Sequence, residues 1–158
     1  MLNDGGAWCS VENKKQENDM DIRVLLADNH PRMRDSLRSL IDKQPGMVVV
    51  GEAENAGGAL QCALEFKPDV VVMDINMADL KDTDAVRRMI SDCPCLKLVA
   101  LSIYPNREFV GSMLKAGASC YLLKDCAFEE LIPAIRSAFN NQTYLSAGLE
   151  KESAHTSR

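Results

Sequence analysis

The sequence predicts an α/β protein of three layers, in which a doubly wound parallel sheet of five strands lies between two layers of helices. Short runs of β-branched and apolar residues alternate five times with segments whose apolar residues recur at helical spacing. The run Val-Val-Val-Met at 70–73 is apolar throughout, which is typical of a strand buried on both faces of a parallel sheet. Both observations favour strands joined by crossover helices over an antiparallel arrangement.

The first half of the chain contains two of these strand and helix pairs. A strand at 22–27 ends at the turn sequence Asp-Asn-His-Pro, and the helix that follows ends at Pro45 and Gly46. A second strand is expected at 47–53, and Asn55 is placed to cap the next helix.

The second half repeats the pattern three times. We expect strands at 69–73, 96–101 and 120–123, each followed by a helix. Gly117 ends the fourth helix. Pro133 lies inside the last helical pattern, where it either delays the start of the helix or kinks it.

Length and composition are those of one soluble domain, with 158 residues, 46% hydrophobic and 26% charged. The net charge is −5 and no basic block stands out, so we expect no nucleic-acid contact through phosphates. Apolar runs are far too short for a membrane span, and the N-terminus does not read as a signal peptide. These features favour a cytoplasmic protein without membrane contact.

The six cysteines form no CxxC pair, and only two histidines accompany them. Zinc sites need a second ligand pair at a suitable spacing, and the chain has none. We therefore expect free thiols in a reducing compartment, with neither a metal nor a disulfide.

Polar residues stand at the ends of four of the five expected strands. Since the carboxyl ends of parallel strands meet at one crevice, these residues should face each other: Asp28, Asn29, Asp74, Ser102 and Lys124. Carboxylate and amide oxygens can hold a hard dication such as Mg²⁺, while a hydroxyl and an ammonium can hold anionic oxygens. Such a set suits a phosphoryl group beside a metal. No P-loop or GxGxxG sequence is present, which excludes the common nucleotide cradles.

Residues 21 to about 146 resemble the receiver domain of two-component response regulators, which has the CheY-like, flavodoxin-like (βα)5 fold. Within that family the chain is most similar to receivers that precede a LuxR/NarL-type DNA-binding domain. The resemblance is carried, in the family's order and spacing, by IRVLLADNHPRMRDSLRSLI, VVGEAENAGGAL, PDVVVMDINM, VALS, AGASCYLLKD and FEELIPAIRSA.

The resemblance implies a metal site built around a phospho-acceptor. Asp74 matches the aspartate that accepts the phosphoryl group. Asp28 and Asn29 match the acidic pair that holds Mg²⁺, together with Asp74 and the backbone carbonyl of Asn76.

The resemblance also implies a switch around the phosphoryl group. Ser102 and Lys124 match the hydroxyl residue and the lysine that contact this group, and Tyr121 matches an aromatic that turns inward on activation. The phosphoryl donor is then a sensor histidine kinase or a phosphotransfer protein, the domain catalyses only its own phosphorylation and dephosphorylation, and a homodimer is one form of output.

Some positions depart from the family pattern and support a second hypothesis. Asn29 lacks the charge of an acid, so weaker Mg²⁺ binding is expected, and Ala78 and Asp82 replace the usual proline and glycine. The alternative is therefore a degenerate receiver that acts as an interaction scaffold without phosphorylation. Asn29 could instead cap a helix, and His30 reads as a structural or solvated residue.

Three segments are expected along the chain. Residues 1–20 are polar and aperiodic and read as a flexible leader, and residues 21–142 form the receiver. Residues 143–158 read as a linker or tail with no DNA-binding domain, so a regulatory effect on transcription would act through a helix-turn-helix domain that this chain does not contain.

Overall fold

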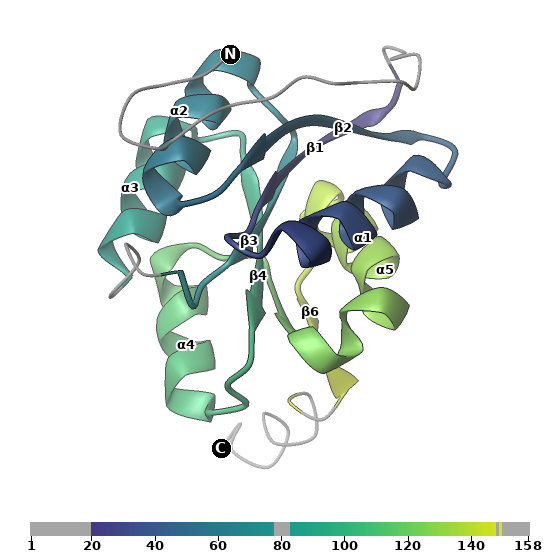
Figure 1. Cartoon of the computed structure of the whole chain (residues 1–158). Helices are drawn as coiled ribbons and strands as arrows, with labels where there is room; N and C mark the ends of the chain where they lie inside the picture. The colour runs from purple at the N-terminus through teal and green to yellow at the C-terminus, as the bar shows by residue number, and fades with distance from the viewer. Residues whose placement is uncertain (1–19, 78–82, 148, 150–158) are drawn as a thin grey trace.

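The sheet in the computed structural model has six parallel strands in the order β2-β1-β3-β4-β5-β6, and the structure describes residues 20–77, 83–147 and 149. The strands are β1 (Ile22–Ala27), β2 (Met47–Ala53), β3 (Val70–Asp74), β4 (Lys97–Ser102), β5 (Cys120–Leu123) and β6 (Tyr144–Leu145). The helices are α1 (Pro31–Asp42), α2 (Ala56–Phe66), α3 (Asp84–Asp92), α4 (Arg107–Ala116) and α5 (Ala127–Phe139). Figure 1 shows α2, α3 and α4 on one face of the sheet and α1 and α5 on the other. The predicted three-layer parallel architecture is confirmed.

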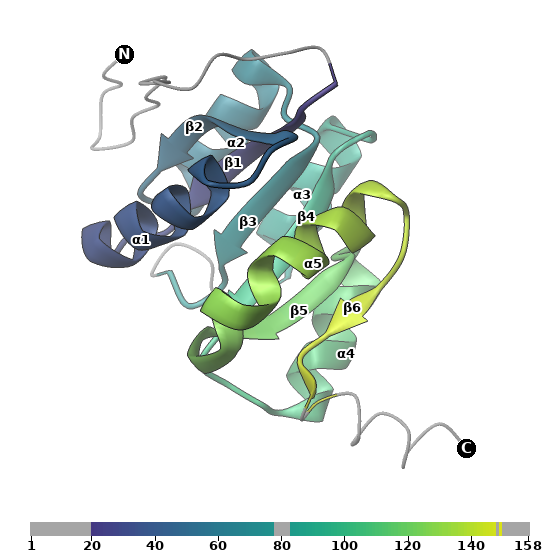
Figure 2. The ribbon, with the colours of Figure 1, turned by 90° about the vertical axis from the view of Figure 1, so that its right-hand side faces the viewer.

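The prediction of five strands was wrong by one, because β6 adds to the edge of the sheet beside β5 (Figure 2). Its two residues are too few to show the alternation by which a strand is recognised in a sequence. Ser146 fixes the segment in place. Its N–H donates to Tyr121 O at 3.1 Å, and its hydroxyl accepts from Leu123 N at 2.9 Å and donates to Glu130 Oε1 at 2.5 Å.

Two apolar cores lie on the two faces of the sheet. Along β3, Val70 and Val72 pack with residues of α1 and α5, whereas Val71 and Met73 pack with residues of α2, α3 and α4. Successive side chains of a strand point to opposite faces. The unbroken apolar run of β3 therefore follows from burial on both sides.

The helix ends follow the expected local chemistry. The side chain of Asn55 accepts a hydrogen bond from Gly58 N at 2.7 Å, and Gly117 ends α4 with a φ of +117° that favours glycine. Helix α5 begins at Ala127, directly after the 3₁₀ turn Lys124–Cys126, and continues through Pro133.

One of the cysteine expectations was wrong. Cys62, buried in α2, is disulfide-bonded. The described thiols that are free are Cys93, Cys95, Cys120 and Cys126. The pairing of cysteines cannot be deduced from their spacing alone, so the sequence did not show this disulfide.

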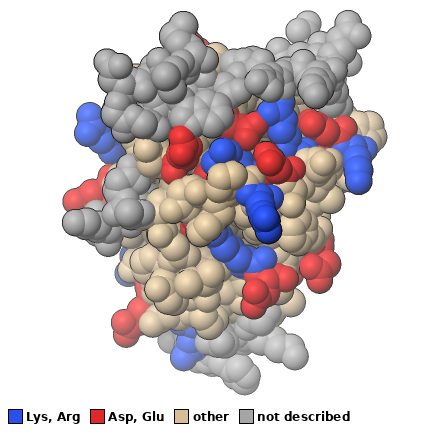
Figure 3. Space-filling model, viewed as in Figure 1, with Lys and Arg blue, Asp and Glu red and all other residues tan. Residues whose placement is uncertain are grey.

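The described surface carries local charge pairs. On the face shown in Figure 3, Lys and Arg side chains are interspersed with Asp and Glu. Arg38 pairs with Asp42 at 3.8 Å, and Arg88 pairs with Asp92 at 3.8 Å. Among the helices of the described residues, none has the length and apolar character needed to cross a bilayer.

Candidate functional site

The carboxyl edge of the sheet brings together two buried carboxylates and one ammonium group. Asp28 directly follows β1 and is 1% exposed, and Asp74 ends β3 and is 0% exposed. Lys124 directly follows β5, and its Nζ lies 2.9 Å from Asp74 Oδ2 and 3.5 Å from Asp28 Oδ2. The structure thus places these three predicted site residues in one cluster.

The two carboxylates are held differently. Asp74 Oδ1 accepts from Asn76 N at 2.8 Å, and Asp28 Oδ1 accepts from His30 N at 2.8 Å. Asp28 Oδ2 is buried and accepts no hydrogen bond. Burying a charged oxygen without a hydrogen bond is costly, and the single Lys124 ammonium faces two carboxylates. The described side chains therefore fit a further cation at this edge, and the oxygen donors suit a hard dication.

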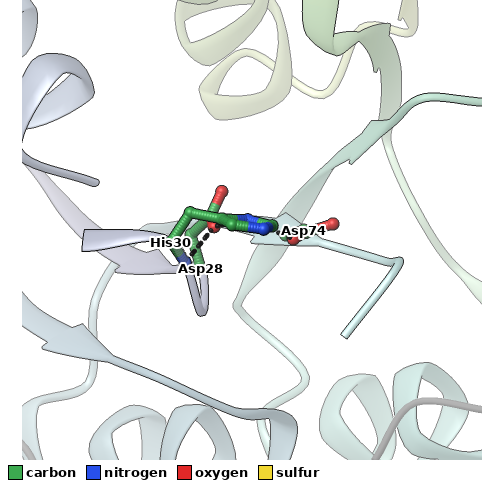
Figure 4. Close-up of side chains that lie close together, drawn as sticks. All are labelled: Asp28, His30 and Asp74. Atoms are coloured by element: carbon green, nitrogen blue, oxygen red, sulfur yellow. Dashed lines mark hydrogen bonds and ion pairs between the residues drawn. The ribbon is translucent and has the colours of Figure 1, made fainter. Parts of the chain in front are cut away.

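His30 belongs to the same cluster, which the sequence reasoning missed. Its Nδ1 lies 3.2 Å from Asp28 Oδ1 and 3.9 Å from Asp74 Oδ2, and Figure 4 shows the imidazole between the two carboxyl groups. His30 is the N-cap of α1, with an extended backbone (φ −101°, ψ 107°) and no side-chain capping bond. The sequence could have indicated this role, because His30 directly follows Asp28 and Asn29 at the end of a strand.

The two asparagines occupy different surroundings. Asn29 is exposed, and it does not cap α1, because His30 takes that position. Asn76 lies in the loop after β3, and its Oδ1 accepts from Ile103 N at 3.0 Å. The side chain of Asn76 therefore ties the loop after β3 to the loop after β4.

Ser102 and Tyr121 both hold Tyr104 in the loop after β4. The buried Ser102 Oγ accepts from Tyr104 N at 2.9 Å, and the Tyr121 hydroxyl donates to Tyr104 O at 2.8 Å. The Tyr121 ring is fully buried and lies edge-on to Phe109, with ring centroids 6.4 Å apart. Burial raises the pKa of Tyr121, against the lowering effect of a hydrogen bond with Ser102. In this structure the Tyr121 ring is buried and its hydroxyl holds the loop after β4.

A buried ion pair supports the end of β1 and was also missed. Arg34 of α1 donates from Nη1 to Asp28 O at 2.6 Å and from Nε to Glu52 Oε1 at 3.0 Å. Glu52 of β2 also pairs with Arg38. Arg34 stands three residues before Leu37 on the buried stripe of α1, and a charged residue on such a stripe indicates a buried partner.

The loop after β3 is only partly described. Ala78 and Asp82, whose identities depart from the family pattern, lie outside the described residues. Asp84 begins α3, and its side chain is exposed.

Comparison with known proteins gives a consistent result. The family profile described as "Response regulator receiver domain" matches residues 24–136. The chain is 37% identical over 128 residues to the transcriptional regulatory protein MctR of Rhizobium johnstonii, covering 81% of this chain and 60% of MctR. It is 34% identical over 133 residues to the response regulator GacA of Pseudomonas viridiflava, covering 84% of this chain and 62% of GacA. The chain therefore spans about three fifths of the length of these relatives.

Solved structures agree with the sequence relatives. The crystal structure of a LuxR-family two-component response regulator from Aurantimonas sp. superposes with a TM-score of 0.80 at 30% identity, covering 85% of this chain and 96% of that one. The similarity thus extends over nearly the whole of that structure.

Proposed function

Because the chain belongs to the response regulator receiver domain family of two-component systems, we propose that Asp74 accepts a phosphoryl group from a phosphohistidine of a sensor histidine kinase or a phosphotransfer protein. The observation that carries this proposal is the buried Asp74 carboxylate with Lys124 Nζ at 2.9 Å, at the carboxyl end of a central strand. The relatives named above are regulators, and MctR is a transcriptional one, so the proposed output is transcription, through a domain outside this chain.

The transfer is a displacement at phosphorus. Asp74 Oδ2, which faces Lys124, attacks the phosphorus as the bond from phosphorus to the imidazole nitrogen breaks, and the leaving imidazole takes a proton from water. Asn76 N–H holds Asp74 Oδ1 and so orients the attacking oxygen. The Lys124 ammonium then faces the oxygens of the acyl phosphate and offsets their charge. The domain turns over no separate substrate in this proposal.

The proposed cofactor is Mg²⁺, held by Asp28, Asn29, Asp74 and the backbone carbonyl of Asn76. When bound, it supplies positive charge to the phosphoryl oxygens. The buried Asp28 Oδ2, which accepts no hydrogen bond, supports this assignment. Since Asn29 is neutral, the proposed affinity for Mg²⁺ is weaker than that of a site with a third carboxylate.

The conformational response would begin at Ser102. Its hydroxyl now accepts from Tyr104 N, and a turn of that hydroxyl toward a phosphoryl oxygen removes one of the two bonds that hold Tyr104. The loop after β4 and the Tyr121 ring would then shift, and the surface of α4, β5 and α5 would change. That surface, or the one formed by α1 and α5, is the proposed contact for a second copy or an output domain.

The segment assignment completes the proposal. The receiver comprises residues 21–142, preceded by a leader at 1–20 and followed by a linker at 143–158. The pairing of β6 with β5 indicates that the start of this linker docks on the receiver.

Phosphorylation can be tested by intact mass spectrometry after incubation with Mg²⁺ and acetyl phosphate. The expected result is a gain of one phosphoryl mass that is lost in Asp74→Asn and kept in Asp35→Asn, whose side chain is exposed on α1. No adduct on any of the three proteins would overturn the proposal and leave the scaffold alternative, which no contact among the described residues favours.

A further inference from the structure

The imidazole of His30 faces both carboxylates of the site. Its Nδ1 is 3.2 Å from Asp28 Oδ1 and 3.9 Å from Asp74 Oδ2. The His30 side chain is 65% exposed, whereas that of Asp28 is 2% exposed. A ring nitrogen and a carboxylate oxygen at 3.2 Å attract each other only with a proton or a metal cation between them.

These separations match the spacing of ligands around one metal ion. For metal–ligand bonds of about 2.1 Å, neighbouring ligand atoms of an octahedral ion lie about 3.0 Å apart and opposite ones about 4.2 Å apart. Both distances from His30 Nδ1 fall between these limits. The ligand atoms of Asp28, His30 and Asp74 all lie within 4.8 Å of one another.

A second observation concerns the other oxygen of the Asp28 carboxylate, Oδ2, which lies 3.5 Å from Lys124 Nζ. Asp28 is 1% exposed, and its Oδ2 accepts no hydrogen bond although it lies on the Lys124 side of the cluster. The neighbouring Asn29, where the family has an acid, adds no charge. The described donors are therefore two carboxylates and one imidazole, and imidazole nitrogen is a ligand that transition metals accept far more readily than Mg²⁺ does.

We propose that His30 Nδ1 is a direct metal ligand in this chain, so that the site takes a first-row transition-metal dication such as Mn²⁺ in preference to Mg²⁺. The proposal rests on the proposed function in one respect, namely that Asp28 and Asp74 hold the metal. In this arrangement His30 offsets the ligand strength that is lost with a neutral Asn29.

The test is a Mn²⁺ titration of the full, tag-free chain, followed by pulsed electron paramagnetic resonance of the bound ion. Imidazole nitrogen bound to Mn²⁺ gives a ¹⁴N modulation that oxygen ligands do not give. The variants are His30→Phe, which keeps a planar ring without nitrogen, and His155→Phe, which removes the other histidine of the chain. Circular dichroism checks that both variants fold.

We expect a ¹⁴N modulation of the electron paramagnetic resonance signal in the wild type and in His155→Phe. This modulation should be lost in His30→Phe. We also expect the Kd for Mn²⁺ to rise about tenfold or more in His30→Phe. The Kd for Mg²⁺, measured by competition, should change less than about threefold, because Mg²⁺ gains little from a nitrogen ligand.

Two results would overturn the inference, and they can be told apart. Mn²⁺ binding that Asp74→Asn abolishes, but that shows no ¹⁴N modulation or an unchanged Kd in His30→Phe, removes His30 as a ligand and leaves the carboxylate site of the proposed function. If the wild type binds neither Mn²⁺ nor Mg²⁺, then both the proposed Mg²⁺ cofactor and the proposed role of His30 as a metal ligand are wrong. The acetyl phosphate assay then decides separately on phosphorylation.

Discussion

Lys124 Nζ lies 2.9 Å from Asp74 Oδ2, although Asp74 ends β3 and Lys124 follows β5, two strands that are not neighbours in the sheet. Strand β4 separates β3 from β5, so the lysine reaches across the end of β4 to the carboxylate. The same ammonium lies 3.5 Å from Asp28 Oδ2. It is therefore the cation shared by both buried carboxylates.

Removing this ammonium should destabilise the domain more than removing the carboxylate it faces. Lys124→Met leaves two carboxylates facing each other, and we expect the free energy of unfolding in urea to fall by about 1–3 kcal/mol. Asp74→Asn relieves the excess negative charge and should leave that free energy unchanged or higher. Lys115→Met, at an exposed position of α4, is the control. Equal losses for Lys124→Met and Asp74→Asn would contradict this interpretation of the cluster.

The buried pair of Arg34 and Glu52 should contribute to stability and to the geometry of the site. Arg34→Met leaves the buried Glu52 with Arg38 alone and removes the bond to Asp28 O, so we expect a loss of about 3 kcal/mol in urea unfolding. Arg87→Met, which removes an exposed pair with Asp84, should cost less than about 1 kcal/mol. Similar losses in unfolding free energy for the two variants would show that the buried pair contributes no more to stability than the exposed pair.

The Tyr121 hydroxyl should restrain the loop after β4. Tyr121→Phe keeps the ring packed on Phe109 but removes the bond to Tyr104 O, so we expect a loss of about 1 kcal/mol in stability. Backbone amides of this loop should also exchange with solvent faster in hydrogen-exchange experiments. Tyr104→Phe keeps the accepting carbonyl and should leave exchange unchanged. Unchanged exchange in Tyr121→Phe as well would mean that the hydroxyl does not restrain the loop.

Stability should fall at alkaline pH through Cys120. Burial raises the pKa of this thiol from 9.0 to about 11, against a smaller lowering effect of a backbone hydrogen bond from Tyr144. Since the folded pKa lies above the unfolded one, the protonated thiol contributes fully below pH 9, and its contribution is lost as the pH rises from 9 through about 11. Unfolding free energies of the wild type and Cys120→Val, compared at several pH values, should converge over that range. A constant difference would contradict the prediction.

The same burial predicts a difference in thiol reactivity. At pH 8, a thiol reagent should modify the exposed Cys95 and leave Cys120 unmodified in the folded protein, because Cys120 is fully buried and its pKa is about 11. Peptide mapping by mass spectrometry identifies the modified residue. Labelling of both cysteines at equal rates would show that β5 opens readily.

The alternation of strands and helices, and the polar residues at the strand ends, could be predicted from the amino-acid sequence. Apolar periodicity, the Asn55 cap and the Gly117 stop act over a few residues, so they can be read along the chain. The sequence also predicted that three of these residues meet, because the carboxyl ends of parallel strands lie at one edge of the sheet. They are Asp28, Asp74 and Lys124.

Features that depend on contacts between residues far apart in the chain could not be predicted in this way. The two residues of β6 become a strand only because Ser146 bonds to β5 and to Glu130, and Arg34 finds Glu52 only when α1 packs beside β2. His30 stands two residues after Asp28, but its approach to Asp74 depends on β1 and β3 lying side by side. Such contacts leave no periodic pattern in the chain, because the partners of each residue are set by the packing of whole elements.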